Sequence, residues 1–243
     1  MEEWMKPFEN CTLCPRKCGV NRSTGKAGAC HVDAQMRVAR AALHFWEEPC
    51  ISGEEGSGAV FFTGCSLGCV FCQNTEISRG QAGENVSVER LAEIYLNLQE
   101  QGANNINLVT AGHYAPGVAE SLRRAKDMGL QIPVVFNSSG YELPDTLRLL
   151  DGLVDMYLPD MKYMDGKLAG KYSHAQNYPV VAKAALEEMV RQCPVCEFDE
   201  RGRMKKGVIV RHLLLPGHVK ESKAVLKYLH ETYQDQIYIS IMS

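Results

Sequence analysis

The sequence has no long apolar run and no large excess of charge of either sign. No stretch approaches the about eighteen consecutive apolar residues of a membrane-spanning helix, so a transmembrane protein is not expected. The formal net charge of the 243-residue chain is -3, which gives no indication of a polyanionic partner such as a nucleic acid. The charged start, residues 1–6, has no apolar segment behind it and so does not resemble a secretory signal. These absences predict a soluble, cytoplasmic protein.

The ten cysteines therefore lack the oxidising setting in which disulfides form, and they are expected to be metal ligands. Three of them follow the apolar run 59–64 in the spacing C-x3-C-x2-C, namely Cys65, Cys69 and Cys72. Three thiolates can bind three irons of a 4Fe-4S cluster and leave the fourth iron open to a ligand. The alternatives are a zinc turn and unpaired core thiols, although a zinc site usually adds a second CxxC or histidines.

A second set of cysteines lies near the N-terminus, in a glycine-bearing loop: Cys11, Cys14, Cys18 and Cys30. Four thiolates can close a tetrahedral site. An auxiliary iron-sulfur cluster and a zinc ion both fit this ligand number, and an empty or oxidised site is a third alternative. The set predicts a metal or cluster site that is separate from the first triplet.

Short apolar segments alternate with helical patterns along the rest of the chain. Strands are predicted at 59–64, 105–111, 132–138, 153–161, 207–215 and 237–242. Helices are predicted near 91–102, 116–129, 145–150, 179–191 and 219–233. This alternation is typical of an α/β fold with a parallel sheet, and six such units form a partial (β/α)6 barrel. We therefore predict an N-terminal cysteine-rich extension over 1–57 and a partial barrel over 58–243.

Polar residues follow several predicted strands, at the edge where a parallel barrel binds its ligand. These candidates are Gly112, His113, Asn137, Ser138, Asp160, Lys162 and His212. Asp160 and Lys162 share one face of their strand, where a buried charge needs a partner. A ligand is one such partner, and a salt bridge at the barrel rim is the alternative. For His212 we favour structural or ligand-side packing over proton transfer.

Three further cysteines lie outside both sets. Cys193 and Cys196 form a CxxC, which could be a redox pair, a ligand pair for another metal or a chance surface pair; the last is favoured because no other His or Cys is close in sequence. Cys50 has no neighbouring thiol in the sequence and is expected to be a plain buried thiol.

The C-x3-C-x2-C triplet, with Phe71 before its last cysteine, resembles the radical S-adenosylmethionine (SAM) superfamily. In that family the open iron chelates the amino and carboxylate groups of SAM. An electron then cleaves the sulfonium, and the resulting 5'-deoxyadenosyl radical abstracts hydrogen from a substrate. The resemblance implies that Phe71 lies beside the adenine, that the fold is an open barrel, and that flavodoxin or ferredoxin supplies the electron.

Four further segments resemble the uncharacterised branch of radical SAM proteins that is similar to pyruvate formate-lyase activating enzyme: Cys14-Pro-Arg-Lys-Cys18-Gly-Val-Asn-Arg22, Trp46-Glu-Glu-Pro-Cys50-Ile-Ser-Gly53, Phe71-Cys72-Gln-Asn74 and Arg211-His212-Leu-Leu-Leu-Pro-Gly217. The resemblance spans nearly the whole chain. It implies that Asp160 and Lys162 reach the methionyl part of SAM and that Asn137 and Ser138 meet the ribose. It also places Asn74 among the cofactor contacts.

The sequence departs from this pattern in two places. Many radical SAM enzymes carry Gly-Gly-Glu after the second strand to hold the SAM amino group, whereas this chain has Ala-Gly112-His113-Tyr. The Gly112 position still allows a backbone carbonyl to approach the ligand. The chain also ends at Ser243, directly after the sixth predicted strand, where members of this branch generally continue.

The leading functional hypothesis is a radical SAM enzyme acting on an unknown small-molecule, peptide or protein substrate. The first alternative is an activase that installs a glycyl radical in a partner protein, as pyruvate formate-lyase activating enzyme does. The second is a metal-stapled binding module without turnover. Polar residues at several strand ends argue against this last alternative, because a structural staple needs no ligand cleft.

Overall fold

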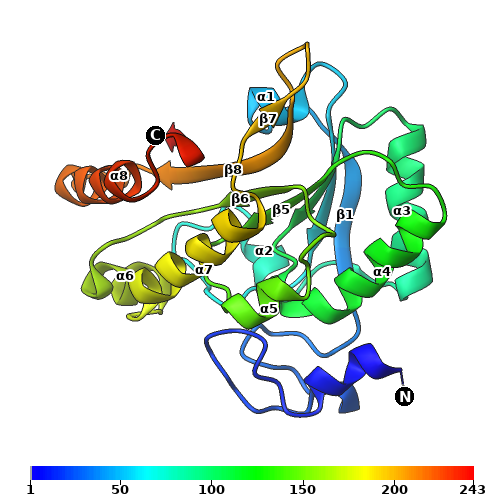
Figure 1. Cartoon of the computed structure of the whole chain (residues 1–243). Coiled ribbons are helices and arrows are strands. Elements are labelled where there is room, and N and C mark those ends of the chain that lie inside the picture. The colour runs from blue at the N-terminus through cyan, green and yellow to red at the C-terminus, as the bar shows by residue number, and fades with distance from the viewer. Residues whose placement is uncertain (1) are drawn as a thin grey trace.

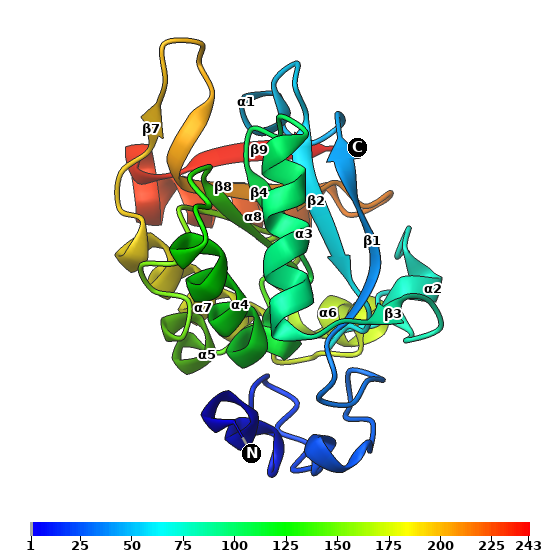
Figure 2. The same ribbon diagram turned by 90° about the vertical axis from the view of Figure 1, so that its right-hand side faces the viewer.

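The computed structural model describes residues 2–243, and a twisted sheet runs through its centre (Figures 1 and 2). Within these residues nine strands form the sheet in the order β3-β1-β2-β4-β5-β6-β8-β7, with β9 paired to β8. The strands are β1 (Arg37–His44), β2 (Ser57–Phe62), β3 (Glu84–Asn85), β4 (Ile106–Val109), β5 (Val134–Ser138), β6 (Met156–Pro159), β7 (Glu197–Phe198), β8 (Met204–Leu213) and β9 (Tyr238–Met242).

Each of the six predicted strands is present, as β2, β4, β5, β6, β8 and β9, and each pairs in parallel with the next. The register places Val60 opposite Leu108, and Leu108 opposite Phe136. The parallel order brings the carboxyl ends of these strands to one edge. This confirms the predicted α/β class and partial (β/α)6 barrel.

Helices connect the strands, and the longer ones cover one face of the sheet (Figure 2). They are α1 (Pro49–Ser52), α2 (Thr75–Ser78), α3 (Val88–Glu100), α4 (Ala115–Asp127), α5 (Pro144–Arg148), α6 (Gly166–Ser173), α7 (Tyr178–Gln192) and α8 (Val219–Tyr233). Ser87 caps α3 by accepting a hydrogen bond from the Arg90 amide, and a proline begins α4. In the described part of the chain, no helix combines the length and the apolar character that crossing a membrane requires.

Both faces of the parallel strands are buried. In β5, Val134 and Phe136 pack into the large core under the helices, whereas Val135 points to the other face and joins a smaller inner core. Ile51 of α1 belongs to this inner core, so α1 closes the amino-terminal end of the barrel interior. The polar residues that follow the strands are left at the opposite, carboxyl end.

The N-terminal segment lies below that carboxyl edge, as the blue chain in Figures 1 and 2 shows. It contains two short 3-10 helices, η1 (Glu3–Phe8) and η2 (Arg22–Thr24); the other two, η3 (Gly112–Tyr114) and η4 (Gln234–Gln236), belong to the barrel. Within the predicted extension 1–57, β1 pairs antiparallel with β2 and so enlarges the sheet. The strand at β1 was not predicted. The division of the chain at residue 57 into two domains stays a prediction.

Candidate functional site

The triplet of cysteines lies on a loop that leaves β2 at the carboxyl edge of the sheet. The loop begins at Gly64, whose φ of +96° is a conformation that favours glycine. A Cβ atom at Gly64 would stand 2.7 Å from the Cys30 carbonyl oxygen and 3.1 Å from Nε2 of His113. The Cys65 amide then donates to the same Cys30 carbonyl at 3.2 Å. The N-terminal segment therefore fixes the start of the cysteine loop.

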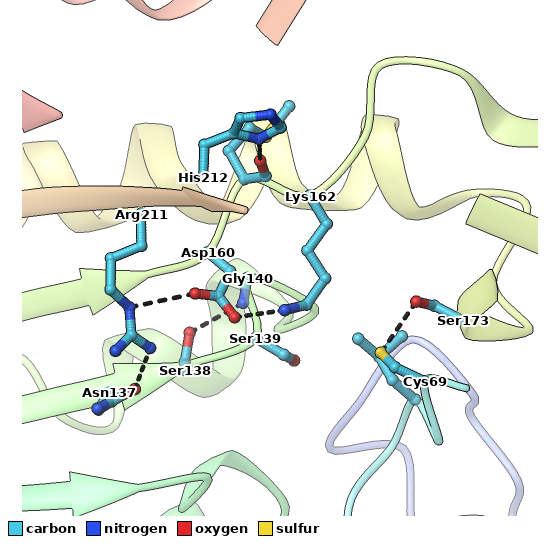
Figure 3. A network of polar contacts seen from close by, with 12 residues as sticks. Cys69, Asn137, Ser138, Ser139, Gly140, Asp160, Lys162, Ser173, Arg211 and His212 are labelled. Carbon is cyan, nitrogen blue, oxygen red and sulfur yellow. Dashed lines mark hydrogen bonds and ion pairs between the residues drawn. The ribbon is translucent and has the colours of Figure 1, made fainter. Parts of the chain in front are cut away.

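Hydrogen-bond donors point at two of the three sulfur atoms. The Ser173 hydroxyl donates to Sγ of Cys69 at 2.9 Å (Figure 3), and the Leu67 amide donates to Sγ of Cys65 at 3.4 Å. Burial raises the pKa of Cys65 to about 11, and the neighbouring thiols of Cys69 and Cys72 add to this rise. Binding to a metal centre would displace the proton, and the donors would then stabilise the thiolates.

The cysteines are not gathered around a point of single-ion size. Among residues 2–243, no three His, Cys, Asp or Glu side chains are placed to hold one metal ion. Each cysteine that binds a 4Fe-4S cluster takes a different iron, so its ligand sulfurs surround a larger group. Three thiolates on one loop are a donor set that fits three irons of such a cluster and leaves the fourth iron open.

Asp160 follows β6 and lies between two cations (Figure 3). Its Oδ1 accepts a hydrogen bond from Nε of Arg211 at 3.2 Å, and its Oδ2 forms an ion pair with Nζ of Lys162. Burial alone would raise the pKa of Asp160, but the Lys162 and Arg211 cations hold it below its usual value. Asp160 and Lys162 thus pair with each other, which was the salt-bridge alternative, and their side chains are only 17% and 14% exposed. Their contact with a ligand stays a prediction.

Arg211 connects this pair to a second acid, Glu47. Its Nη1 lies 3.2 Å from Oε1 of Glu47, and its Nη2 donates to Oδ1 of Asn137 at 2.6 Å. The Glu47 carboxylate also accepts hydrogen bonds from the side-chain amides of Asn137 and Asn107. The result is a layer of paired charges across the barrel interior. The sequence analysis missed the roles of Glu47 and Asn107, because their contacts join residues far apart in the chain.

Phe71 lies close to this layer. Nζ of Lys162 is 6.0 Å from the centre of the Phe71 ring, so the residue before Cys72 and the charged pair face the same region. Asn74 is exposed and begins α2 without a side-chain capping bond. Its predicted contact with the cofactor stays a prediction.

The two candidate histidines are both buried but differ in their hydrogen bonds. Nε2 of His113 pairs with the Thr63 carbonyl at 2.8 Å, so its ring supports the loop that precedes Cys65. Burial and the nearby Arg22 cation lower the pKa of His113 to about 3, which keeps the ring neutral. His212 bonds the Met161 carbonyl through Nδ1 at 2.7 Å, whereas its Nε2 has no partner within the described residues. His212 and Lys162 both line a narrow pocket beside α6 and α8.

Glu142 occupies the space beside Gly112, just after the end of β4. A Cβ at Gly112 would lie 3.1 Å from Cγ of Glu142. Ser138 donates to Oε2 of Glu142 at 3.0 Å and accepts a hydrogen bond from the Gly140 amide. Burial raises the pKa of Glu142 to about 7, and the nearby Asp160 carboxylate adds to the rise. A carboxyl group from the loop after β5 thus reaches the end of β4, which local sequence could not reveal.

The four N-terminal cysteines lie near one another. A Cβ at Gly28 would stand 3.4 Å from Sγ of Cys18 and 3.5 Å from Sγ of Cys30, so these two thiols border a space that glycine leaves open. Sγ of Cys18 also lies 3.9 Å from the Cys11 carbonyl. Burial raises the pKa of Cys14 to about 11, and the thiols of Cys30, Cys11 and Cys18 add to the rise.

The remaining cysteines lie at the other end of the molecule. Sγ of Cys193 is 3.3 Å from the Asp155 carbonyl, and Sγ of Cys196 is 3.5 Å from the Gln236 carbonyl. Cys50 and Cys196 both pack against the inner core, and Cys196 is the thiol neighbour of Cys50 in the fold. Cys50 is only partly buried, whereas a buried thiol was expected. Cys193 and Cys196 thus lie against backbone carbonyls, apart from the cysteine triplet. Cys193 is buried, so the favoured interpretation of this CxxC as a surface pair is wrong for Cys193.

The raised pKa of Glu142 generates a test by pH. Between its usual value of 4.5 and about 7, the folded protein binds a proton at Glu142 that the unfolded chain has released. Wild-type stability relative to Glu142→Gln should therefore fall by about 2 to 3 kcal/mol as the pH rises from about 5 to about 8. Urea unfolding at a series of pH values measures this difference.

Glu188→Gln is the matched control for this test. Glu188 forms a hydrogen bond and an ion pair with Arg191 and a further ion pair with Arg148, and these contacts lower its pKa. Glu188 is therefore ionised above about pH 5 in both the folded and the unfolded chain. The stability difference for that variant should be constant from about pH 5 to pH 8. A constant difference for Glu142→Gln as well would show that Glu142 titrates normally.

Comparisons with known proteins agree with this geometry. The family model described as Radical SAM superfamily matches residues 59–229. The uncharacterized protein MJ0674 of Methanocaldococcus jannaschii is 29% identical over 219 residues, which are 87% of this chain and 59% of that protein. The crystal structure of HydG, a maturase of the FeFe-hydrogenase, has a TM-score of 0.52 at 14% identity and covers 74% of this chain and 41% of that chain.

These matches differ in what they show. At 14% identity the likeness to HydG shows the fold alone. The chain spans 59% of the length of MJ0674 and 41% of that of HydG, so the activity of a whole protein does not transfer from either. The family model covers more than half of this chain and includes the cysteine triplet. The protein belongs to the radical SAM superfamily.

Proposed function

We propose that the protein reductively cleaves SAM at a 4Fe-4S cluster held by Cys65, Cys69 and Cys72. Membership of the superfamily implies an enzyme that uses such a cluster, SAM and an electron donor such as flavodoxin or ferredoxin. Held there, such a cluster would supply the single electron that splits the sulfonium of SAM into methionine and a 5'-deoxyadenosyl radical, the species that takes hydrogen from the substrate.

One observation carries this proposal: the cysteine loop and the charged pair meet at the same edge of the barrel. Ser173 and the Leu67 amide direct donors at the sulfurs of this loop, and Lys162 faces the ring of Phe71. A binding module that used metal only as a staple would not require a partly buried ion pair facing its metal loop. The arrangement therefore supports catalysis over a structural role.

The chain's own residues would hold the ligand as follows. Asp160 and Lys162 offer opposite charges to the ammonium and carboxylate of the methionyl group. Phe71 supplies an aromatic surface for the adenine, 6.0 Å from Nζ of Lys162. A contact of His212 with the adenine stays a prediction. Asn137 and Ser138 are assigned to the ribose, although the side chains of both are now engaged by protein groups.

The N-terminal cysteines form the second site in this proposal. A Cβ at Gly28 would lie 3.4 Å from Sγ of Cys18 and 3.5 Å from Sγ of Cys30, so these two thiols stand side by side next to the glycine. Four thiolates are enough to hold an iron-sulfur cluster, which is the form proposed here, and a zinc ion is the alternative. The cluster would be bound by Cys11, Cys14, Cys18 and Cys30, on a loop separate from the cysteine triplet.

The activase alternative differs from the leading proposal only in the substrate, which would be a glycine residue of a partner protein that gives up a hydrogen atom. It rests on the resemblance to pyruvate formate-lyase activating enzymes at Asp160 and Lys162, and these residues serve SAM binding in either case. A glycyl-radical protein encoded or purified with this chain would favour an activase. No contact among the described residues favours a glycyl-radical partner over a small substrate.

The first prediction of this function is slow cleavage of SAM without substrate. Reduced, anaerobically reconstituted protein should release 5'-deoxyadenosine and methionine, measured by liquid chromatography. Cys69→Ala should abolish the release because it removes one cluster ligand. Cys196→Ala, which changes a thiol far from the triplet, should leave it unchanged. A complete, reducible cluster that yields no 5'-deoxyadenosine would contradict the proposed function.

A second prediction concerns SAM affinity. Lys162→Met and Asp160→Asn should each weaken SAM binding at least about tenfold with the cluster intact, because removing one partner of a buried charge pair costs about 2 to 5 kcal/mol. Calorimetry with the reconstituted protein measures the affinity. Lys167→Met and Asp145→Asn change exposed residues and should bind SAM as wild type does. Equal affinities in all four variants would remove the assigned role of the pair.

A third prediction tests the second site by metal content. Replacing Cys14 and Cys18 together with serine should remove one cluster's worth of iron and sulfide. The SAM-dependent change in the electron paramagnetic resonance (EPR) signal of the first cluster should persist. Loss of one zinc instead would identify a zinc site, and an unaltered metal content would show that these thiols bind no metal.

A further inference from the structure

Arg22 is a fully buried cation that has no acidic partner. It is 1% exposed, and its guanidinium donates to the carbonyls of Val32, Asp33 and His113 at 3.2, 2.7 and 2.7 Å. The rings of Phe8 and Tyr114 lie against it, at 4.9 and 5.4 Å from ring centre to Cζ. Within residues 2–243 it forms no ion pair with a carboxylate.

A buried charge of this kind normally requires an opposite charge, because carbonyl dipoles replace only part of the lost hydration. Arg211, at the centre of the barrel, has two carboxylates beside it. Arg22 has sulfur instead. Its Nη1 is 3.6 Å from Sγ of Cys11. The N-terminal thiols, once deprotonated, are therefore the candidate counter-ion of Arg22.

The position of the Arg22 side chain agrees with this. The point that a Cβ of Gly28 would occupy lies 3.1 Å from Cδ of Arg22 and within 3.5 Å of the sulfurs of both Cys18 and Cys30. Arg22 and three of the four thiols thus border one small region. Four cysteine thiolates carry more negative charge than an iron-sulfide core neutralises, so a cluster there would be an anion next to a buried cation.

We propose that Arg22 compensates the negative charge of the second cluster. Its cation would help the protein to retain the cluster and would raise the reduction potential of the cluster. This inference rests on the second cluster proposed above. A nearby positive charge favours the more negative, reduced form of a cluster, so the potential should depend on the charge of Arg22. Arg22 is a positioning residue in this role, since it does not touch the SAM site.

Two contacts join this region to the cysteine triplet. The His113 carbonyl accepts from Arg22, and the His113 ring bonds the Thr63 carbonyl just before Cys65. The Cys30 carbonyl accepts the Cys65 amide directly. The second cluster would therefore lie against the backbone that carries the first. A change in the charge of the second cluster would then alter the electrostatic potential at the cysteine triplet.

The test is an EPR-monitored redox titration of the reconstituted full chain. The signal that SAM does not alter reports the second cluster. Arg22→Met should shift its potential to more negative values, whereas Arg22→Lys, which keeps the charge, should remain close to wild type. Lys26→Met removes an exposed charge from the same segment and should leave the potential unchanged. Equal potentials in Arg22→Met and Lys26→Met would overturn the inference.

Iron retention against a chelator provides the second measurement if Arg22→Met does not keep its cluster. Loss of a group that supports metal ligands typically weakens metal binding roughly 10- to 100-fold, and Arg22→Lys should restore most of it. If a folded Arg22→Lys protein loses the cluster as readily as Arg22→Met, the charge is not the reason and the inference fails. A wild-type protein with iron for only one cluster would instead reject the second site, whatever Arg22 does.

A thermal unfolding cycle separates charge compensation from ordinary packing. Arg22→Met should lower the melting temperature more in the cluster-loaded protein than in the cluster-free protein, where the cation of the wild type is uncompensated. A purely structural arginine would lose the same hydrogen bonds in both states. Equal losses in the two states would therefore contradict the proposed role.

Discussion

The ion pairs of Arg211 hold the barrel interior together, because they allow charges to stand where parallel strands are otherwise apolar on both faces. Arg211 on β8 contacts Asp160 after β6 and Glu47 before α1, and it bonds Asn137 on β5. The layer therefore ties three separate segments to one cation on β8. Removing Arg211 would leave the partly buried Glu47 carboxylate without its ion-pair partner and Asp160 with Lys162 alone, which costs more than the loss of an exposed salt bridge. The backbone of Asp160 is held separately, because its amide donates to the Ser138 carbonyl and its carbonyl accepts from the Tyr178 hydroxyl.

The N-terminal segment performs a similar task at the carboxyl edge through backbone groups. Arg16 donates to the Ser66 carbonyl at 2.8 Å and to the His174 carbonyl at 2.7 Å, so it spans from the first turn of the cysteine loop to the end of α6. Thr146 on α5 donates to the Leu13 carbonyl at 2.6 Å. These contacts require the segment to be folded, which four free thiols in a loop would not ensure. Metal binding in the segment and order in the cysteine loop are therefore expected to be coupled.

Patterns within short stretches predicted the parts of the fold that depend on local sequence. The apolar runs identified the parallel strands, and the C-x3-C-x2-C spacing identified the first set of cysteines. The strand β1 escaped prediction because its sequence, Arg-Val-Ala-Arg-Ala-Ala-Leu-His, is largely half-buried or exposed and has no apolar run. Glu142 and Glu47 escaped for another reason, since Glu142 reaches Gly112, and Glu47 reaches Arg211, through tertiary contacts with segments distant in the sequence. No spacing rule within one stretch records such contacts.

The balance of charge at the site explains why a zwitterionic ligand suits it. Without a ligand, the acids Glu47 and Asp160 face the cations Arg211 and Lys162, and each charge has a partner. A methionyl group carries one ammonium and one carboxylate, so it can exchange partners with Asp160 and Lys162 and leave the total charge of the layer unchanged. An anionic ligand would leave one acid unpaired in a partly buried site, at the cost of an uncompensated charge. The ion pair between Asp160 and Lys162 thus keeps the site neutral in the absence of a ligand. In the proposed complex, the ammonium and carboxylate of the ligand replace this pair with two new ion pairs.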